Sequence, residues 1–265
     1  MGKYRAGDFS GLAQRYQRYR PDYPNEILAA AVAFLREGGV DVRNLLALDV
    51  GAGTGISTRA WQRVLGEACC IVGAEPGAEM CAMAARSTAT GCGIAYVRAK
   101  AEALPIAAGA AALVAAAQAA HWFDRPRFYA EAERVLGPGG VLAIVANHRN
   151  WSAAAYLERY ETLLERHAPG YRRKFRRRAF VAELARLPWV AATATSTHRW
   201  SRRLTTAELL GLMRSSSIAR AAAESLGEAG FRTALATLIA EAVEADGRIT
   251  LPYVAEIHLA RRRAA

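Results

Sequence analysis

The chain has little lysine and no long apolar run. Of its 35 basic residues only Lys3, Lys100 and Lys174 are lysine, and the formal net charge is +11. No uncharged apolar run reaches the roughly 18 residues that a membrane-spanning helix needs, and the first residues lack the apolar core of a secretory signal. We therefore expect a cytoplasmic protein with no membrane partner.

The four cysteines do not follow a metal-binding pattern. Cys69, Cys70, Cys81 and Cys92 contain no CxxC pair, and no histidine lies at ligand spacing from them. Structural zinc sites need such spacing, so we expect no metal. Their apolar surroundings predict that the four cysteines are small buried hydrophobic residues in a reducing compartment.

The excess positive charge permits nucleic-acid binding but does not demand it. Arginine and alanine are both abundant, which is typical of GC-rich coding, and no RRM, zinc-finger or KH signature is present. We expect a solvated basic surface rather than a polyanion site. The arginine-rich run at 171–180 is interpreted in the same way, with attraction of a carboxylate- or phosphate-bearing substrate as its alternative role.

Strands and helices are predicted to alternate up to residue 147. The strands are expected at 44–50, 69–75, 96–98, 111–117 and 141–147. The helices are expected at 26–37 with Asn25 as its cap, and at 55–65, 78–87 and 125–136, with a turn at 137–140. This alternation indicates βαβ units in a parallel sheet, where ligands bind beyond the carboxyl ends of the strands.

The character of the chain changes after residue 147. The pattern predicts helices over 150–186, a strand at 189–200, a helix at 204–213 capped by Thr205 or Thr206, and a final edge strand at 249–260 that contains Pro252. We expect one domain made of four parts: an N-terminal cover and first helix (1–40), a ligand-binding core (41–149), a helical lid insertion (150–188), and C-terminal strands and helices (189–265).

The stretch LALDVGAGTGIST, residues 46–58, places Gly51, Gly53 and Gly55 directly after the first predicted strand. Their GxGxG spacing departs from the GxGxxG dinucleotide fingerprint, and no lysine follows as in a Walker loop. Asp49 would repel a phosphate by about 1 to 4 kcal/mol at roughly 4 Å. The same carboxylate suits a ligand with a cationic amino group.

Glu75 ends the second predicted strand, twenty residues after Gly55. A carboxylate at this place can accept both hydroxyls of a ribose. Asp49 and Glu75 together predict an adenosyl ligand without phosphate that carries a positively charged amino-acid tail.

These motifs make the chain similar to the class I S-adenosylmethionine-dependent methyltransferases of the small-molecule type, in a subgroup near the trans-aconitate methyltransferases. LDVGAGTG resembles their first motif, and GAEPGAEM at 73–80 resembles their second-strand motif. AEALP at 101–105 resembles the segment that lies along adenine. AAQAAHWFD at 116–124 resembles the end of the fourth strand, and RVLGPGGVLAI at 134–144 resembles the helix-turn-strand that follows. The resemblance runs from about Phe9 to Asn147 and resumes at LTTAELL and LPYVAEIHLARR.

The resemblance implies a fold and a cofactor. The fold would be an α/β, Rossmann-like, doubly wound, mainly parallel seven-stranded sheet with an antiparallel C-terminal edge strand and a helical lid insertion. The cofactor would be S-adenosyl-L-methionine. The residues expected to bind it are Tyr19, Arg20, Asp49, Gly51, Ala52, Gly53, Thr54, Gly55, Glu75, Pro76, Met80, Ala101, Glu102 and Gln118.

The acceptor side is expected to use residues before the first strand and after the fourth. His121 is the candidate catalytic base, since its ordinary pKa lies near neutrality. The candidate substrate contacts are Tyr16, Tyr23, Trp122 and Phe123. The implied reaction is an SN2 methyl transfer to a heteroatom or carbon of a small molecule, in secondary metabolism, by a monomer or homodimer.

Two alternatives stay open at this point. Lys100 and the alanine-rich segment 106–117 depart from the family pattern, which favours a protein that has kept the fold but catalyses another displacement, such as an intramolecular ring closure. The net charge prompts methylation of RNA or DNA, but QAAHW stands where an aromatic-proline tetrapeptide such as NPPY would be expected.

Overall fold

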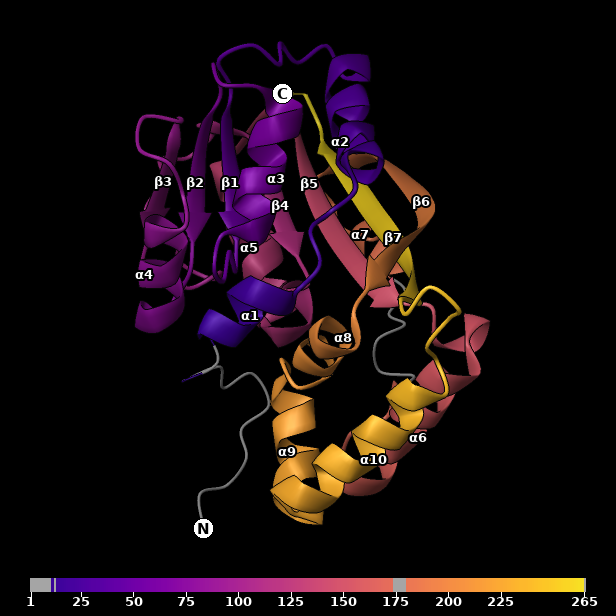
Figure 1. Cartoon of the computed structure of the whole chain (residues 1–265). Helices are drawn as coiled ribbons and strands as arrows, with labels where there is room; N and C mark the ends of the chain where they lie inside the picture. The colour runs from indigo at the N-terminus through magenta and orange to yellow at the C-terminus, as the bar shows by residue number, and fades with distance from the viewer. Residues whose placement is uncertain (1–10, 12, 174–179, 265) are drawn as a thin grey trace. The chain divides into compact units, whose positions relative to one another are not determined.

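The computed structural model describes residues 11, 13–173 and 180–264, and a seven-stranded sheet runs through this described part (Figure 1). The strand order is β3-β2-β1-β4-β5-β7-β6. Strands β1 to β5 pair in parallel, and the sheet ends in antiparallel strands. The strand bounds are β1 Leu46–Val50, β2 Cys70–Ala74, β3 Ile94–Val97, β4 Ala111–Ala117, β5 Leu136–Arg149, β6 Val190–Leu204 and β7 Ile249–Arg262. The predicted Rossmann-like sheet is confirmed.

The chain divides into two compact units, and each is described by itself. The sheet unit comprises Asp22–Asn147, Ala179–His198 and Ala255–Ala265. The helical unit comprises Met1–Pro21, His148–Arg178 and Arg199–Val254. Strands β5, β6 and β7 each contribute residues to both units. The single-domain description of the sequence stays a prediction.

Strand β4 shows why an alanine-rich segment forms a strand here. It pairs with β1 on one side and β5 on the other, and all but one of its residues are buried. Alanine is a poor strand former, but a central parallel strand is covered on both faces, and small side chains let the covering helices approach closely. Burial therefore overrides intrinsic propensity.

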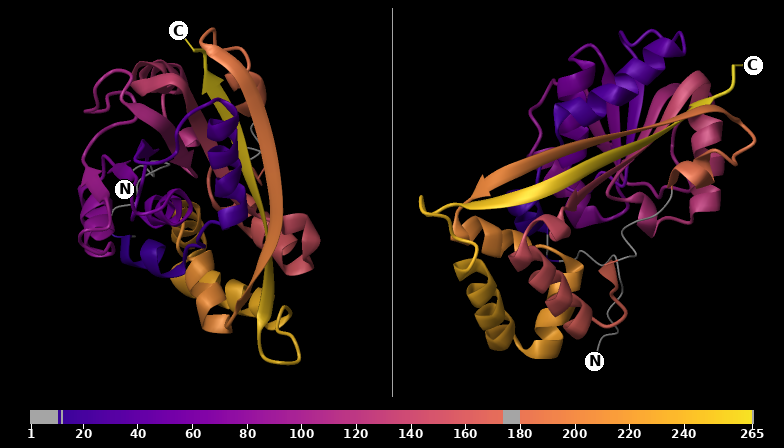
Figure 2. Two further views of the ribbon diagram at one scale, coloured as in Figure 1. Left: turned by 90° about the horizontal axis from the view of Figure 1, so that it is seen from above. Right: turned by 90° about the vertical axis from the view of Figure 1, so that its right-hand side faces the viewer.

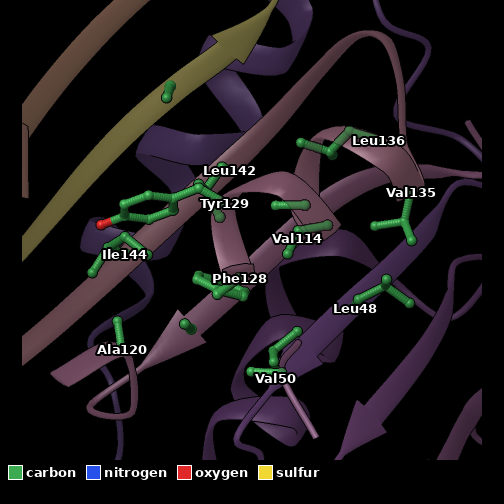
Figure 3. Close-up of a cluster of buried hydrophobic side chains, with 14 of the residues drawn as sticks. Leu48, Val50, Val114, Ala120, Phe128, Tyr129, Val135, Leu136, Leu142 and Ile144 are labelled. Atoms are coloured by element: carbon green, nitrogen blue, oxygen red, sulfur yellow. The ribbon is translucent and has the colours of Figure 1, made fainter. Parts of the chain in front are cut away.

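Helices cover both faces of the sheet in the sheet unit. Leu48 and Val50 of β1, Val114 of β4 and Ile144 of β5 belong to one buried cluster with Phe128 of α5 (Figure 3), and this core continues onto α7. Helices α2 and α3 pack against one another in the same unit (Figure 1). The helix bounds in this unit are α2 Asn25–Glu37, α3 Ile56–Leu65, α4 Ala78–Arg86, α5 Arg125–Val135 and α7 Phe180–Leu184, with the 3-10 turn η1 at Ala120–Trp122.

The helical unit is built around its own apolar core. Helix α6 packs on α9 and α10, and α8 packs on α1 and α10. Thr205 caps α8 as predicted, since its hydroxyl accepts from the Glu208 backbone and the Glu208 carboxylate accepts from the Thr205 backbone. The helix bounds here are α1 Ala13–Tyr19, α6 Ala155–His167, α8 Thr206–Met213, α9 Ser217–Leu226 and α10 Glu228–Ala240, with the 3-10 turn η2 at Trp151–Ala153.

Some local predictions need correction. Asn25 is the first residue of α2 and not its cap, because Pro24 occupies that position without a side-chain hydrogen bond. The turn predicted at 137–140 is the first part of β5, where the pairing with β4 is irregular and Gly139 has a φ of +73°. Of the four cysteines predicted to be buried, Cys69 is buried, Cys81 and Cys92 are partly exposed, and Cys70 is exposed at the first residue of β2.

The end of the chain and the lid also differ in detail from the prediction. The last strand, β7, lies between β5 and β6, so β6 is outermost (Figure 2). The predicted lid divides between the units, since α6 belongs to the helical unit and α7 packs in the sheet unit. Part of the arginine-rich run, residues 174–179, lies outside the described residues. No helix in the described ranges is long and apolar enough to cross a membrane.

The core of the sheet unit provides a test of this packing. Phe128 has no exposed surface, so Phe128→Ala should lower the free energy of unfolding by about 3 to 5 kcal/mol in urea titrations. Val181→Ala, on an exposed position of α7, should change it by less than about 0.5 kcal/mol. Equal effects of the two substitutions would contradict the described core.

Candidate cofactor site

The glycine loop after β1 has a backbone that side chains would disturb. Gly51, Gly53 and Gly55 all have positive φ, between +58° and +79°, which is the left-handed region that glycine adopts without strain. A side chain at Gly51 would overlap Ala119, whereas one at Gly53 would meet nothing within 4 Å. The loop is thus closely packed at Gly51 and open at Gly53, where a ligand can approach the backbone.

The loop is attached to the neighbouring strand β2. The backbone N–H groups of Gly51 and Ala52 both donate to the carbonyl of Ala74, at 2.8 and 3.1 Å. The next residue, Glu75, accepts from the Gly53 N–H at 3.0 Å and from the Gly77 N–H at 2.8 Å, one on each carboxylate oxygen. One side chain therefore links the tip of the loop to the turn that precedes α4.

The Glu75 carboxylate keeps acceptor capacity for a ligand. A carboxylate offers about four lone-pair sites, and the two backbone N–H groups use two of them. Burial raises the pKa of Glu75, and the two backbone hydrogen bonds oppose that rise. The prediction that Glu75 binds ribose hydroxyls stays a prediction, and the free lone pairs suit it.

Asp49 is buried under the loop with no exposed surface. Its Oδ2 accepts from the hydroxyls of Ser57 and Thr58 in the first turn of α3, at 2.7 and 2.6 Å. Its Oδ1 is buried and has no hydrogen-bond partner among the described residues. Burial raises the pKa of this carboxyl to about 6, against the effect of the two hydroxyls.

Asp49 therefore has two roles to reconcile. Its bonds to Ser57 and Thr58 hold the first turn of α3 against β1, which positions the loop between them. Its unpartnered Oδ1 suits a donor group of a ligand, because a buried acceptor without a partner is costly. The predicted contact with a cationic amino group fits this second oxygen and remains a prediction.

Gln118 lies at the carboxyl end of β4 with a φ of +53°, a region that non-glycine residues seldom adopt. Its backbone N–H donates to the Val145 carbonyl at 2.8 Å, and its side-chain amide donates to the Asn147 carbonyl. The Asn147 side chain in turn donates to the Asp22 carbonyl at 3.2 Å. Such strained residues cluster at ligand sites, which supports Gln118 as a site residue.

The remaining residues predicted around the adenosyl group lie in the same unit with different exposure. Met80 and Ala101 are buried, and Pro76 is exposed. Glu102 accepts from the Asp124 backbone at 2.9 Å, so it anchors the segment after η1. Ala52 and Thr54 are buried in the glycine loop, and the Thr54 hydroxyl has no described partner.

The aromatic segment after β4 splits into exposed and packed residues. His121 and Trp122 are exposed in η1, and their rings lie 4.6 Å apart. Phe123 instead packs edge-on against Phe128 at 4.9 Å, which gives it a core contact. The base role of His121 and the substrate contacts of Trp122 and Phe123 stay predictions.

The predicted N-terminal cover is divided between the units. Tyr23 is buried in the sheet unit, while Tyr16, Tyr19 and Arg20 belong to the helical unit. The contacts of these residues with cofactor or substrate stay predictions.

Sequence reasoning missed several residues that build this site. Ser57 and Thr58 hold Asp49, and Asn147 orients the segment that contains Asp22. Two hydroxyl residues just inside the helix after a glycine loop were a usable signal, because they can reach a carboxylate at the end of the preceding strand. Nothing in the sequence singled out Asn147.

The donor set fits S-adenosylmethionine on structural grounds. The site offers an unpartnered buried Asp49 oxygen, free lone pairs on Glu75 and an open approach at Gly53. The Asp49 oxygen suits the ammonium group of the cofactor, and the Glu75 lone pairs suit its ribose. The open approach at Gly53 lets the cofactor lie close to the backbone. Among the described residues no group of three histidine, cysteine or acidic side chains could hold a metal ion.

The comparisons with known proteins agree with this chemistry. Residues 48–144 match the family described as a methyltransferase domain. A protein of Dictyostelium discoideum with a methyltransferase name is 29% identical over 136 residues, 51% of this chain and 47% of its own length. One of Mycobacterium tuberculosis, also named as a methyltransferase, is 33% identical over 143 residues, 54% of this chain and 53% of its own. The chain spans about half the length of these relatives.

A solved structure from Anaeromyxobacter dehalogenans, described as a type II methyltransferase, has the same fold. It is 24% identical, has a TM-score of 0.67, and covers 92% of this chain and 98% of its own. The domain match over residues 48–144 confirms the expectation of an enzyme domain and implies S-adenosylmethionine as its cofactor. The trans-aconitate-like subgroup and the small-molecule type stay predictions.

The raised pKa of Asp49 predicts a specific pH dependence of stability. The folded-state pKa of about 6 exceeds the ordinary value of 3.8, so the folded protein holds an extra proton between these values. The stabilising effect is full below about pH 4 and is lost as the pH rises through about 6, which amounts to about 3 kcal/mol. Asp49→Asn, which cannot ionise, should lack this loss.

The measurement is urea unfolding of both proteins between pH 4 and pH 8. The free energy of unfolding of Asp49→Asn should rise relative to the original protein as the pH increases through 6. A difference between the two proteins that is constant over this range would show that the Asp49 carboxyl is ionised throughout.

Proposed function

We propose that this protein transfers a methyl group from S-adenosylmethionine to a small-molecule acceptor. The observation that carries the proposal is the Glu75 carboxylate, which links the open tip of the glycine loop at Gly53 to the turn at Gly77 and keeps lone pairs for a ribose. The match of residues 48–144 to a methyltransferase domain supports it.

Each part of the loop has a role in this proposal. Glu75 accepts the ribose hydroxyls, and the backbone from Gly51 to Gly55 lies against the amino-acid tail. The Asp49 Oδ1 accepts from the ammonium group, while its Oδ2 keeps α3 in place through Ser57 and Thr58. Gln118 borders the site at the end of β4.

The bound cofactor supplies a methyl group on a positively charged sulfur, and an acceptor nucleophile takes this group by in-line displacement. The protein's part is mainly to hold the two reactants in line, which can replace a large share of the entropic barrier. Exposed His121, which follows β4, would take a proton from an oxygen or nitrogen acceptor.

The acceptor proposal follows from what stands after β4. The segment Gln118–Trp122 contains no aromatic-proline tetrapeptide, so a small molecule is favoured over a nucleic-acid base. A step in secondary metabolism, a cytoplasmic location and a monomeric or homodimeric state complete the proposal. Another displacement on the same fold, such as a ring closure, is the outcome to consider if binding occurs without methyl transfer.

Calorimetric titration with S-adenosylmethionine and S-adenosylhomocysteine tests the binding step. We expect micromolar binding that Glu75→Ala weakens at least tenfold, because the ribose would lose hydrogen bonds to a charged group worth about 1.5 to 3 kcal/mol. Glu67→Ala, at an exposed position between α3 and β2, is the control and should bind like the original protein. Absence of binding by the folded original protein would contradict the proposal.

Substitution of His121 tests the proton-transfer step. Once an acceptor is found by mass gain, His121→Ala should lower kcat by about 10² to 10⁴ and leave the affinity for S-adenosylhomocysteine unchanged. His167→Ala, at the end of α6, should leave kcat unchanged. An unchanged kcat in His121→Ala would show that His121 is not the base and that catalysis depends on alignment of the reactants.

A further inference from the structure

The helical unit holds a cluster of arginine and aromatic side chains in which several buried donors have no described partner. We call it the arginine cluster, and its members are Arg20, Arg149, Arg202 and Tyr253, with Trp200 beside them. Arg20 follows α1, Arg149 ends β5, Arg202 lies in β6, and Tyr253 lies in β7. All of these residues belong to the same unit.

The Arg149 side chain is 9% exposed and is held in one orientation. Its Nη2 donates to Glu161 at 3.0 Å, and the other oxygen of Glu161 accepts from the Tyr171 hydroxyl at 2.6 Å. The guanidinium lies 5.0 Å from the ring centre of Tyr160. Its Nε is buried and has no partner among the described residues, so one N–H donor remains available.

The other two arginines are positioned by residues of α1. The Arg20 guanidinium lies 4.9 Å from the ring centre of Tyr16, and its buried Nε also lacks a described partner. Arg202 donates from Nη1 to the Tyr19 carbonyl at 3.2 Å, which holds its guanidinium in place. Arg20 and Arg149 thus each keep one buried N–H donor without a described partner.

Tyr253 completes the cluster. Its side chain is only 3% exposed and stacks on Trp200 with ring centres 4.9 Å apart. Its hydroxyl is buried without a hydrogen-bond partner of good geometry. Burial raises the pKa of this hydroxyl, and the positive charges of Arg149, Arg202 and Arg20, together with a weak hydrogen bond from Arg202 to its oxygen, oppose that rise. A neutral hydroxyl thus lies in the field of three guanidinium groups.

The charges of the arginine cluster are not balanced. Glu161 compensates Arg149. The negative charge of Glu208 also attracts Arg202, but the Glu208 carboxylate accepts hydrogen bonds from the Thr205 backbone and hydroxyl in the cap of α8. Arginine and tyrosine donors left unpaired in a buried place are uncommon in folded proteins. An oxyanion, which accepts several hydrogen bonds and carries negative charge, would satisfy them.

We propose that Arg20, Arg149, Arg202 and Tyr253 bind the carboxylate or phosphate group of a small-molecule ligand. The stacked rings of Trp200 and Tyr253 offer an apolar face for the carbon part of such a molecule. Anion binding by the cluster does not depend on the proposed function.

The test is calorimetric titration of the full chain with inorganic phosphate and, separately, with benzoate. We expect binding of at least one of them, which identifies the preferred oxyanion. Tyr253→Phe should weaken this binding about tenfold, as expected for a lost hydrogen bond to a charged group, without lowering the thermal midpoint. Arg202→Gln should weaken it at least as much.

Arg203→Gln is the matched control. Arg203 follows Arg202 directly in β6, so its side chain points to the opposite face, and it pairs with Glu244 and Asp246. This variant should bind the anion like the original protein. An equal loss of anion affinity in Arg202→Gln and Arg203→Gln would show that the affinity depends only on net charge and would overturn the proposal.

Saturation with S-adenosylhomocysteine separates the remaining outcomes. Undiminished anion binding in its presence supports a ligand other than the cofactor, whereas abolished binding would assign the cluster to the cofactor carboxylate and overturn the proposal. Folded protein that binds S-adenosylhomocysteine but neither anion overturns this inference and leaves the proposed function standing. Folded protein that binds an anion but no cofactor overturns the proposed function and leaves anion binding by the cluster standing.

Discussion

The candidate site depends on two carboxylates that hold the glycine loop between β1 and α3. Glu75 accepts backbone N–H groups from Gly53 and Gly77, and Asp49 accepts the hydroxyls of the first turn of α3. These bonds add to those from the Gly51 and Ala52 backbone to the Ala74 carbonyl. Strand order brings both carboxylates together, since β1 and β2 are neighbours whose carboxyl ends meet at one edge of the sheet.

Both carboxylates have a cost in the protein alone that a ligand can offset. The Asp49 Oδ1 is buried without a partner, and burial raises the pKa of this group to about 6. A ligand that carries a positive charge would favour the ionised form and lower that pKa. Binding of such a ligand at Asp49 would be coupled to ionisation of this carboxyl and would favour cationic over neutral analogues.

Much of the fold was predictable from sequence, because its elements have strong local signals. The apolar run of β1, the glycine loop and the Thr205 cap of α8 all lie where they were expected. The position of β7 between β5 and β6 was not predictable, since strand order depends on pairing between distant segments. Asp49 and Glu75 were found from chemistry and spacing, but Asn147 and Tyr253 gain their partners or their burial only in the folded chain.

A crystal structure with S-adenosylhomocysteine tests the central claim most directly. The account predicts that both ribose hydroxyls bind the Glu75 carboxylate, that the amino-acid tail lies along Gly51–Gly55, and that its ammonium group reaches the Asp49 Oδ1. A ligand bound elsewhere, or one that leaves Glu75 with only its Gly53 and Gly77 partners, would contradict it.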